Sequence, residues 1–266
     1  MREGVPEVRA ALDEWLDDLT LGGQASTART YRSLTKRLED WPDQPMCRQL
    51  VGEVMRTRSR STARTLWAAL SAFCTWSRDQ GYCAVSPMQN VPCPRPERRH
   101  HTYPTVDELR RVYASCRDDR ERVIVRLLLH GLRAGQLLAI RWSDLRGDQL
   151  LIREHKRNRP HLVVIDAGTL RLLETLEWPI AGSYSTVQRL MARLGKDARV
   201  PGFHAHSLRH AWASHASIAG VDALDLQTLG GWSSAQMVAY YTAAAREQGA
   251  LQRSRALSLT ERLLDL

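Results

Sequence analysis

The sequence predicts a mainly α-helical protein of two domains, with one small β-sheet in the second domain. Apolar residues recur at helical spacing through most of the 266 residues. A proline-rich, charged and non-periodic stretch at residues 86–105 interrupts this periodicity, as is typical of a linker. Two short apolar runs, QLLIRE and HLVVIDA, flank the polar stretch HKRNRP and predict a hairpin with a charged tip. We therefore expect a helical domain at 1–92, a linker at 93–103 and a larger domain at 104–266.

Four helices are expected in the first domain. They correspond to PEVRAALDEWLDDL, STARTYRSLTKRLEDW, MCRQLVGEVMRT and STARTLWAALSAFCTWSRDQG, and Ser26 is placed to cap the second. The second and fourth helices both begin with STAR and carry further basic residues. Helix N-termini attract phosphate, so both helices are candidates for binding nucleic acid, with a solvated polar face as the alternative. The candidate side chains are Arg29, Arg32, Lys36 and Arg64, together with Arg98 and Arg99 in the linker.

The second domain begins with a helix, TVDELRRVYASC, in which Thr105 and Glu108 have the spacing of a capping box. A strongly apolar helix, ERVIVRLLLHGL, and a short helix in RAGQLLAIRWSDL precede the hairpin. Helical periodicity returns in TLRLLETL, STVQRLMARLGKDA, HSLRHAWASHASIAG, LDLQTLGGW and SAQMVAYYTAAA. A final amphipathic helix is expected at 250–265, and its apolar positions need cover from this domain or from a neighbouring subunit.

The charge of the chain favours a polyanionic partner. The formal net charge is +9, and of 38 basic residues only Lys36, Lys156 and Lys196 are lysines. Nucleic acid is favoured over a membrane surface, with a solvated basic surface as the alternative. Five cysteines without a CxxC pair argue against a disulfide framework or a zinc ribbon. The sequence shows neither a signal peptide nor an apolar run long enough to span a bilayer, so we expect an intracellular protein.

The stretch HSLRHAWASH places His206, Arg209 and His210 at helical spacings of three and four, on one face. A metal site is unfavoured, because Ser207 stands where zincin-type sites need a glutamate and Arg209 would repel a cation. A structural role suits a lone histidine on an apolar helix, such as His210. An anion suits the arginine, whose planar fork matches phosphate.

Other residues could complete a phosphate-binding site. Arg133 follows a predicted helix boundary, and Lys156 is a lysine in a chain that otherwise uses arginine. Only lysine readily releases a proton at accessible pH. Trp232 can donate through its indole N–H, and Tyr241 could act as a nucleophile. Such a set could transfer a phosphoryl group without a metal, with the arginines stabilising the charge on phosphorus.

The chain resembles the tyrosine recombinase (phage integrase) family. The resemblance is carried by GLRAGQLLAIRWSDL, EHKRNRPHLVVI, HSLRHAWASH and LGGWSSAQMVAYYT, which occur in the family's order over about residues 104–245. It implies an N-terminal four-helix core-binding (SAM-like) domain and an α-rich catalytic domain with a small β-sheet. It also implies a small integrase without an arm-binding domain, acting at the nucleoid of a bacterium or on its phage or plasmid.

The resemblance also implies catalytic roles. Arg133 matches the first catalytic arginine, Lys156 the general acid, and His206 and Arg209 the HxxR pair. Trp232 stands where most members have a second histidine and some have tryptophan. Tyr241 matches the nucleophile, with Tyr240 as its neighbouring competitor. As supporting residues, His210 is expected to bond to backbone, and Gln136 replaces a commonly acidic residue.

The implied activity is site-specific recombination of DNA. Tyr241 would form a 3′-phosphotyrosyl link, and strand exchange would pass through a Holliday junction in a homotetramer, with neither cofactor nor metal. Residues 250–265 could dock onto a neighbouring subunit, and an accessory directionality factor could take part. The alternatives are a type IB topoisomerase-like enzyme that relaxes DNA, and a non-catalytic DNA-binding protein that retains the fold.

Overall fold

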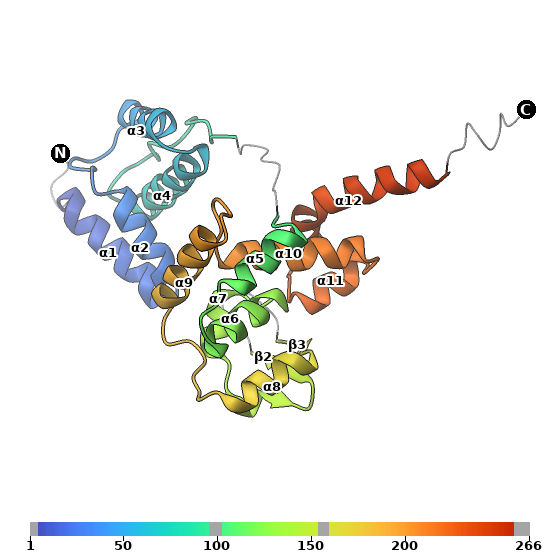
Figure 1. Ribbon diagram of the computed structural model, residues 1–266. Coiled ribbons are helices and arrows are strands. Elements are labelled where there is room, and N and C mark those ends of the chain that lie inside the picture. Colours follow the sequence, from blue (N-terminus) through green and yellow to red (C-terminus); the bar gives the residue numbers. More distant parts are fainter. Residues whose placement is uncertain (1–4, 96–102, 154–159, 258–266) are drawn as a thin grey trace, which may run out of the picture. The chain divides into compact units, whose positions relative to one another are not determined.

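The computed structural model describes residues 5–95, 103–153 and 160–257 (Figure 1). The chain divides into two compact units, Met1–Arg99 and His100–Leu266, with the division inside the stretch expected to be a linker. Arg98 and Arg99 lie outside the described residues, as do 154–159, which include Lys156. The mainly helical fold with one small sheet confirms the fold class expected from periodicity.

The first unit consists of α1 (Val8–Leu21), α2 (Ala25–Leu34), α3 (Gln44–Thr57) and α4 (Arg60–Asp79). Its core is rich in aromatic rings, and the Trp15 and Phe73 rings pack with their centroids 5.5 Å apart. The expected cap of α2 is wrong. The helix begins one residue before Ser26, and Gln24 occupies the capping position without a side-chain hydrogen bond. Ser59 does cap α4 and accepts a hydrogen bond from the Thr62 amide at 3.1 Å.

The second unit surrounds the apolar helix α6. Its elements are α5 (Val106–Ala114), α6 (Asp119–Leu129), α7 (Ala134–Ala139), the 3-10 turn Trp142–Asp144, β1 (Leu145–Arg146), β2 (Gln149–Ile152), β3 (His161–Val164), α8 (Ala167–Thr175), α9 (Tyr184–Asp197), α10 (Ala205–Ile218), α11 (Ala223–Leu229) and α12 (Ala235–Leu257). The capping box at the start of α5 is present, with the Thr105 amide donating to Glu108 Oε2 at 2.8 Å.

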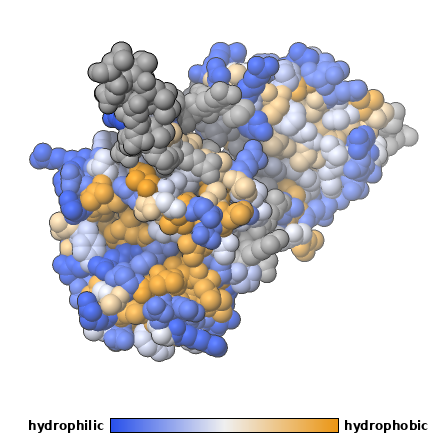
Figure 2. Space-filling model, turned by 90° about the vertical axis from the view of Figure 1, so that its right-hand side faces the viewer, coloured by the Kyte–Doolittle hydropathy of each residue, from blue (hydrophilic) through white to orange (hydrophobic). Residues whose placement is uncertain are grey.

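The expected hairpin is present, and a short third strand extends it. The strands pair antiparallel in the order β1-β2-β3, with Leu151 opposite Leu162. Alternate residues such as Leu150 and Ile152 enter the main core, as the two-residue period of a strand requires. Leu151, Leu162 and Val164 face outward and are exposed. Figure 2 shows hydrophobic areas in the lower part of the molecule, on the side where β3 and α11 lie in Figure 1.

The long helix α12 differs from expectation. It runs without a break through 235–257, so residues 250–257 continue the helix that holds Tyr241 and do not begin a separate one. The rest of the expected terminal helix, 258–266, lies outside the described residues. Neither α12 nor any other described helix is long and apolar enough to cross a membrane.

Candidate active site

Two arginines far apart in the sequence converge on one backbone carbonyl. Arg209 Nη2 donates to the Gly230 oxygen at 2.6 Å, and Arg133 Nη1 lies 3.5 Å from the same oxygen. Arg209 Nη1 also donates to the Gly131 carbonyl. Arg209 is fully buried, and a buried guanidinium requires hydrogen-bond acceptors to offset the loss of its hydration. The cation therefore ties α10 to the turn before α7 and to the turn after α11.

Tryptophan rings enclose the buried guanidinium. The Cζ atom of Arg209 lies 4.3 Å from the ring centroid of Trp232 and 5.9 Å from that of Trp212. Trp232 is 4% exposed and belongs to a small core formed by α10, α11 and α12. A cation over an indole face gains about 2 kcal/mol when water is excluded. Trp232, expected as a hydrogen-bond donor, thus holds Arg209 in place by packing.

The two glycines of LGGW allow this turn to pack closely. A Cβ atom on Gly230 would lie 2.4 Å from the Trp232 ring. Gly231 has a φ of +58°, and a Cβ atom there would lie 2.4 Å from Nδ1 of His161. Only glycine fits both the left-handed backbone and this approach. His161 is the first residue of β3, so the turn rests against the strand that follows residues 154–159.

The end of β2, the first strand of this hairpin, is also held in place by side-chain hydrogen bonds. Arg153, next to the end of β2, donates through Nε to Asp144 Oδ1 at 2.9 Å. Asp144 Oδ2 accepts from the Arg141 amide at 2.9 Å, and the side chain of Asp144 is 1% exposed. The hydrogen bond from Arg153 lowers the pKa of Asp144, against the effect of burial. Residues on both sides of the segment that contains Lys156 are therefore anchored to the fold.

Histidines occupy the start of α10. His204 caps the helix and accepts from the Ser207 amide through Nδ1 at 3.1 Å. His206 is exposed, and its ring meets that of the buried His210 edge to face, with centroids 5.0 Å apart. Burial differs among these residues: Arg209 is fully buried and His210 is 9% exposed, whereas His206 is exposed. Within the described ranges, no group of three or more His, Cys, Asp or Glu residues could hold a metal ion.

Arg133 is positioned by the residue that departs from the family pattern. Arg133 precedes α7, and its amide donates to Gln136 Oε1 at 2.8 Å. Gln136 is 2% exposed, and its Nε2 atom has no hydrogen-bond partner among the residues that the structure describes. The side-chain oxygen of Gln136 thus accepts the hydrogen bond that a carboxylate would accept at this position, without adding a negative charge.

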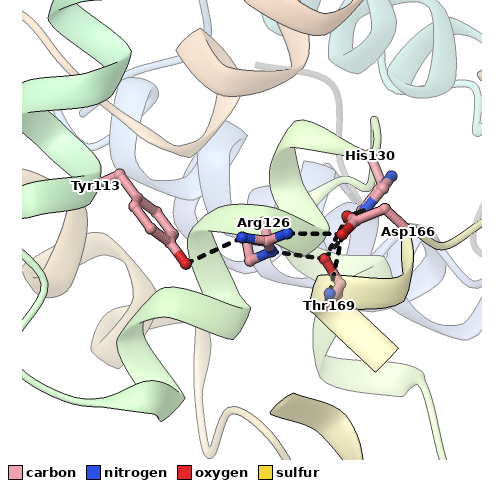
Figure 3. Close-up of polar contacts among 5 residues, drawn as sticks. All are labelled: Tyr113, Arg126, His130, Asp166 and Thr169. Carbon is pink, nitrogen blue, oxygen red and sulfur yellow. Dashed lines mark hydrogen bonds and ion pairs between the residues drawn. The ribbon is translucent and has the colours of Figure 1, made fainter. Parts of the chain in front are cut away.

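A polar cluster joins α6 to the start of α8 (Figure 3). Asp166 accepts from Arg126 Nη2 at 2.6 Å and pairs with His130 Nε2 at 2.8 Å. Burial raises the pKa of Asp166, but hydrogen bonds from Thr169, Arg126 and His130 outweigh it and hold this pKa well below the usual range. His130 ends α6 three residues before Arg133, and Asp166 follows β3. Sequence reasoning missed this cluster, whose partners lie far apart in the chain.

Tyr240 and Tyr241 both belong to α12, which packs against α10. Nearby on α12, Val238 and Thr242 are fully buried. The side chains of the two tyrosines lie outside what the structure describes, as does Lys156. The structure thus brings together Arg133, Arg209, Trp232 and the helix that holds His206.

The basic candidates of the first unit are mostly exposed. Arg29, Lys36 and Arg64 lie at the surface, and Arg64 Nη1 is 3.4 Å from the Pro94 carbonyl. Arg32 is shared between Asp13 at 3.4 Å and Asp17 at 3.7 Å. These carboxylates offset the charge of Arg32, so Arg29, Lys36 and Arg64 carry more of the local positive potential.

Comparison with known proteins agrees with this architecture. Residues 181–248 match the model of the phage integrase family. The tyrosine recombinase XerA of Saccharolobus solfataricus is 28% identical over 206 residues, which are 71% of this chain and 66% of that protein. XerC of Corynebacterium glutamicum is 27% identical over 260 residues, covering 85% of this chain and 83% of its own length. The lambda integrase tetramer bound to a Holliday junction superposes with a TM-score of 0.74 at 19% identity, over 90% of this chain and 78% of that one.

The structural likeness shows a shared fold. Together with the sequence matches, it defines an enzyme of the tyrosine recombinase class, which cleaves and rejoins DNA strands in site-specific recombination. Within this class, the chain is similar to the phage integrase family, whose model matches residues 181–248.

Proposed function

We propose that this protein recombines specific DNA sites through a covalent 3′-phosphotyrosyl intermediate on Tyr241. The convergence of Arg133 and Arg209 on the Gly230 carbonyl, next to the helix that holds His206, carries this proposal. Two guanidinium groups held by rigid elements are suited to stabilising charge that develops on phosphorus. Such preorganised cations allow phosphoryl transfer without a metal ion.

Each residue has a proposed part in the reaction. Tyr241 loses its phenolic proton to solvent, its oxygen forms a bond to the scissile phosphorus, and the bond from phosphorus to the 5′ oxygen breaks. Lys156 gives a proton to that leaving oxygen, which becomes a free 5′ hydroxyl. Arg133, half-buried, and His206, exposed, contact the phosphate. Arg209 contributes its positive charge from the protein interior, and Trp232 holds that guanidinium in place by packing against it.

Rejoining reverses the same chemistry. A 5′ hydroxyl from the partner DNA attacks the phosphotyrosyl phosphorus and releases Tyr241. The energy of the broken bond is kept in the covalent link, so the exchange consumes no ATP. His210 and Gln136 act as supporting residues: Gln136 holds the Arg133 amide, and His210 is proposed to bond to backbone within the site.

The proposed partner is duplex DNA, bound at a core site by both units. In the Met1–Arg99 unit and its junction, Arg29, Arg32, Lys36, Arg64, Arg98 and Arg99 are proposed to contact phosphates. Lambda integrase binds a Holliday junction as a tetramer, which supports a homotetramer here. In such a tetramer, residues 250–265 could dock on a neighbouring subunit, and an accessory factor could set direction. The proposed place of action is the bacterial nucleoid, on chromosomal, phage or plasmid DNA.

One assay separates this function from its alternatives. The purified protein is incubated in EDTA with supercoiled plasmids that carry pairs of segments from the DNA flanking its own gene. Recombinant junctions, scored by sequencing, are the expected result. Relaxation of the plasmids without junctions would indicate a topoisomerase-like enzyme. Tight binding with neither product, and with no covalent complex, would indicate a non-catalytic DNA-binding protein.

A further inference from the structure

Arg199 adopts a backbone conformation that an arginine rarely takes. Its φ is +56°, and Asn90 is the only other non-glycine residue with a positive φ in the described part of the chain. The Val200 amide donates to the Gly195 carbonyl at 2.8 Å, which closes the turn that ends α9. Glycine is the usual residue at this place, because a Cβ atom crowds the following carbonyl in the left-handed region. Backbone stability alone would therefore favour glycine at position 199.

The side chain of Arg199 lines a basic hollow. This hollow has a volume of about 480 Å³, and its walls include Lys196, Arg199, Gly202 and Phe203. Both cations are exposed, and no carboxylate lines the hollow among the described residues. The adjacent Asp197 is already bound to Arg193 Nη1 at 3.0 Å. Two neighbouring cations in a hollow that is lined by no described carboxylate favour an anionic ligand.

The basic hollow belongs to the loop that leads into the proposed active site. Phe203 lines the hollow, and the next residue, His204, caps the helix that carries His206 and Arg209. Five residue steps separate Arg199 from His204, which a fully extended chain spans in at most about 18 Å. By the same measure, Arg199 lies within about 25 Å of His206, so both residues could contact phosphates of one bound duplex.

We propose that Lys196 and Arg199 bind the DNA backbone at a phosphate close to the scissile one and so position the strand for cleavage. This inference rests on the proposed function, because the phosphate belongs to the same bound DNA. It gives a reason for an arginine where the backbone favours glycine: the strained turn presents a guanidinium to the bound strand. Phosphate contacts set the position of a protein on DNA and carry no sequence preference.

The test uses Arg199→Gly, because this variant separates folding from binding. It relieves the strained backbone, so the midpoint temperature of unfolding should rise by about 2–4 °C. It also removes one phosphate contact. A plot of log Kd against log salt concentration for a duplex DNA, measured by fluorescence anisotropy, should therefore lose about 0.9 from its slope. The loss should be equal for unrelated duplex sequences.

Two matched variants complete the experiment. Arg199→Lys retains the charge and should keep the wild-type slope. Arg189→Ala removes an exposed arginine two turns before Lys196 on the same helix, α9; Arg189 does not line the hollow, so the slope should also stay unchanged. An unchanged slope in folded Arg199→Gly would overturn the inference while leaving the recombinase proposal intact, provided that the wild type still forms a covalent DNA complex. A wild type that neither binds DNA nor forms that complex would overturn both.

Discussion

Replacing Gly231 with alanine should disturb the turn whose Gly230 carbonyl is approached by both Arg133 and Arg209. Gly231 has a φ of +58°, where an alanine costs about 1–2 kcal/mol. The new Cβ atom would also lie 2.4 Å from Nδ1 of His161, far inside van der Waals contact, so His161 or the turn must move. Overpacking of this kind costs about 1–3 kcal/mol. We therefore expect Gly231→Ala to lower the free energy of unfolding by about 2–5 kcal/mol.

Gly147 provides the matched control. Its φ is +61°, and a Cβ atom there would meet nothing within 4 Å. Gly147→Ala should thus show only the backbone cost, about 1–2 kcal/mol in urea unfolding. The difference between the two variants isolates the contact with His161. The yield of covalent protein–DNA complex should also fall more in Gly231→Ala than in Gly147→Ala, because the turn at Gly231 carries the Gly230 carbonyl and Trp232.

A double-mutant cycle tests the assigned cause. His161→Ala should recover part of the stability lost in Gly231→Ala, with a coupling free energy of about 1–3 kcal/mol. Equal losses in Gly231→Ala and Gly147→Ala, together with additive effects in the cycle, would refute the reasoning.

Three further changes have defined outcomes. The folded-state pKa of Asp166 lies below its unfolded value of 3.8, so the stability that its carboxylate contributes is present above about pH 4 and is lost as the pH falls through the folded-state pKa. Asp166→Asn should therefore lower the free energy of unfolding at pH 7. Urea titrations should show that this difference from the wild type shrinks below pH 4. Trp232→Ala should cost about 3–5 kcal/mol in unfolding experiments, and Trp232→Phe clearly less, because a ring would still cover Arg209. Burial raises the pKa of the Cys116 thiol to about 11, so iodoacetamide at pH 8 should label the exposed Cys93 and spare Cys116 in the folded protein, as peptide mapping would show.

Local sequence patterns predicted the elements whose determinants are also local. The capping box of Thr105 and Glu108 and the hairpin flanking HKRNRP depend on neighbours within a few residues, and both are present. The cap of α2 was misplaced by two residues, at Ser26 instead of Gln24, because a serine is a far more common cap than a glutamine. The break expected before residue 250 was wrong, since no residue between 235 and 257 interrupts the α12 backbone.

The features missed from sequence depend on long-range contacts. Periodicity does not reveal that the Gly230 carbonyl is shared by Arg133 and Arg209, which lie in different helical segments. The pairing of Asp166 with Arg126 likewise joins residues 40 positions apart. The spacing in HSLRHAWASH likewise does not reveal that Arg209 is buried against two tryptophans while His206 is exposed.

The covalent intermediate is the most direct test of the central claim. The protein is incubated in EDTA with a library of DNA that includes the segments flanking its gene, then denatured in SDS, trimmed with nuclease and digested for mass spectrometry. A nucleotide attached to Tyr241, with the adduct lost in Tyr241→Phe and kept in Tyr240→Phe, is the result predicted here. Attachment at Tyr240, or an adduct that survives Tyr241→Phe, would contradict the assigned nucleophile. The absence of any adduct on DNA that the protein binds tightly would contradict the catalytic account itself.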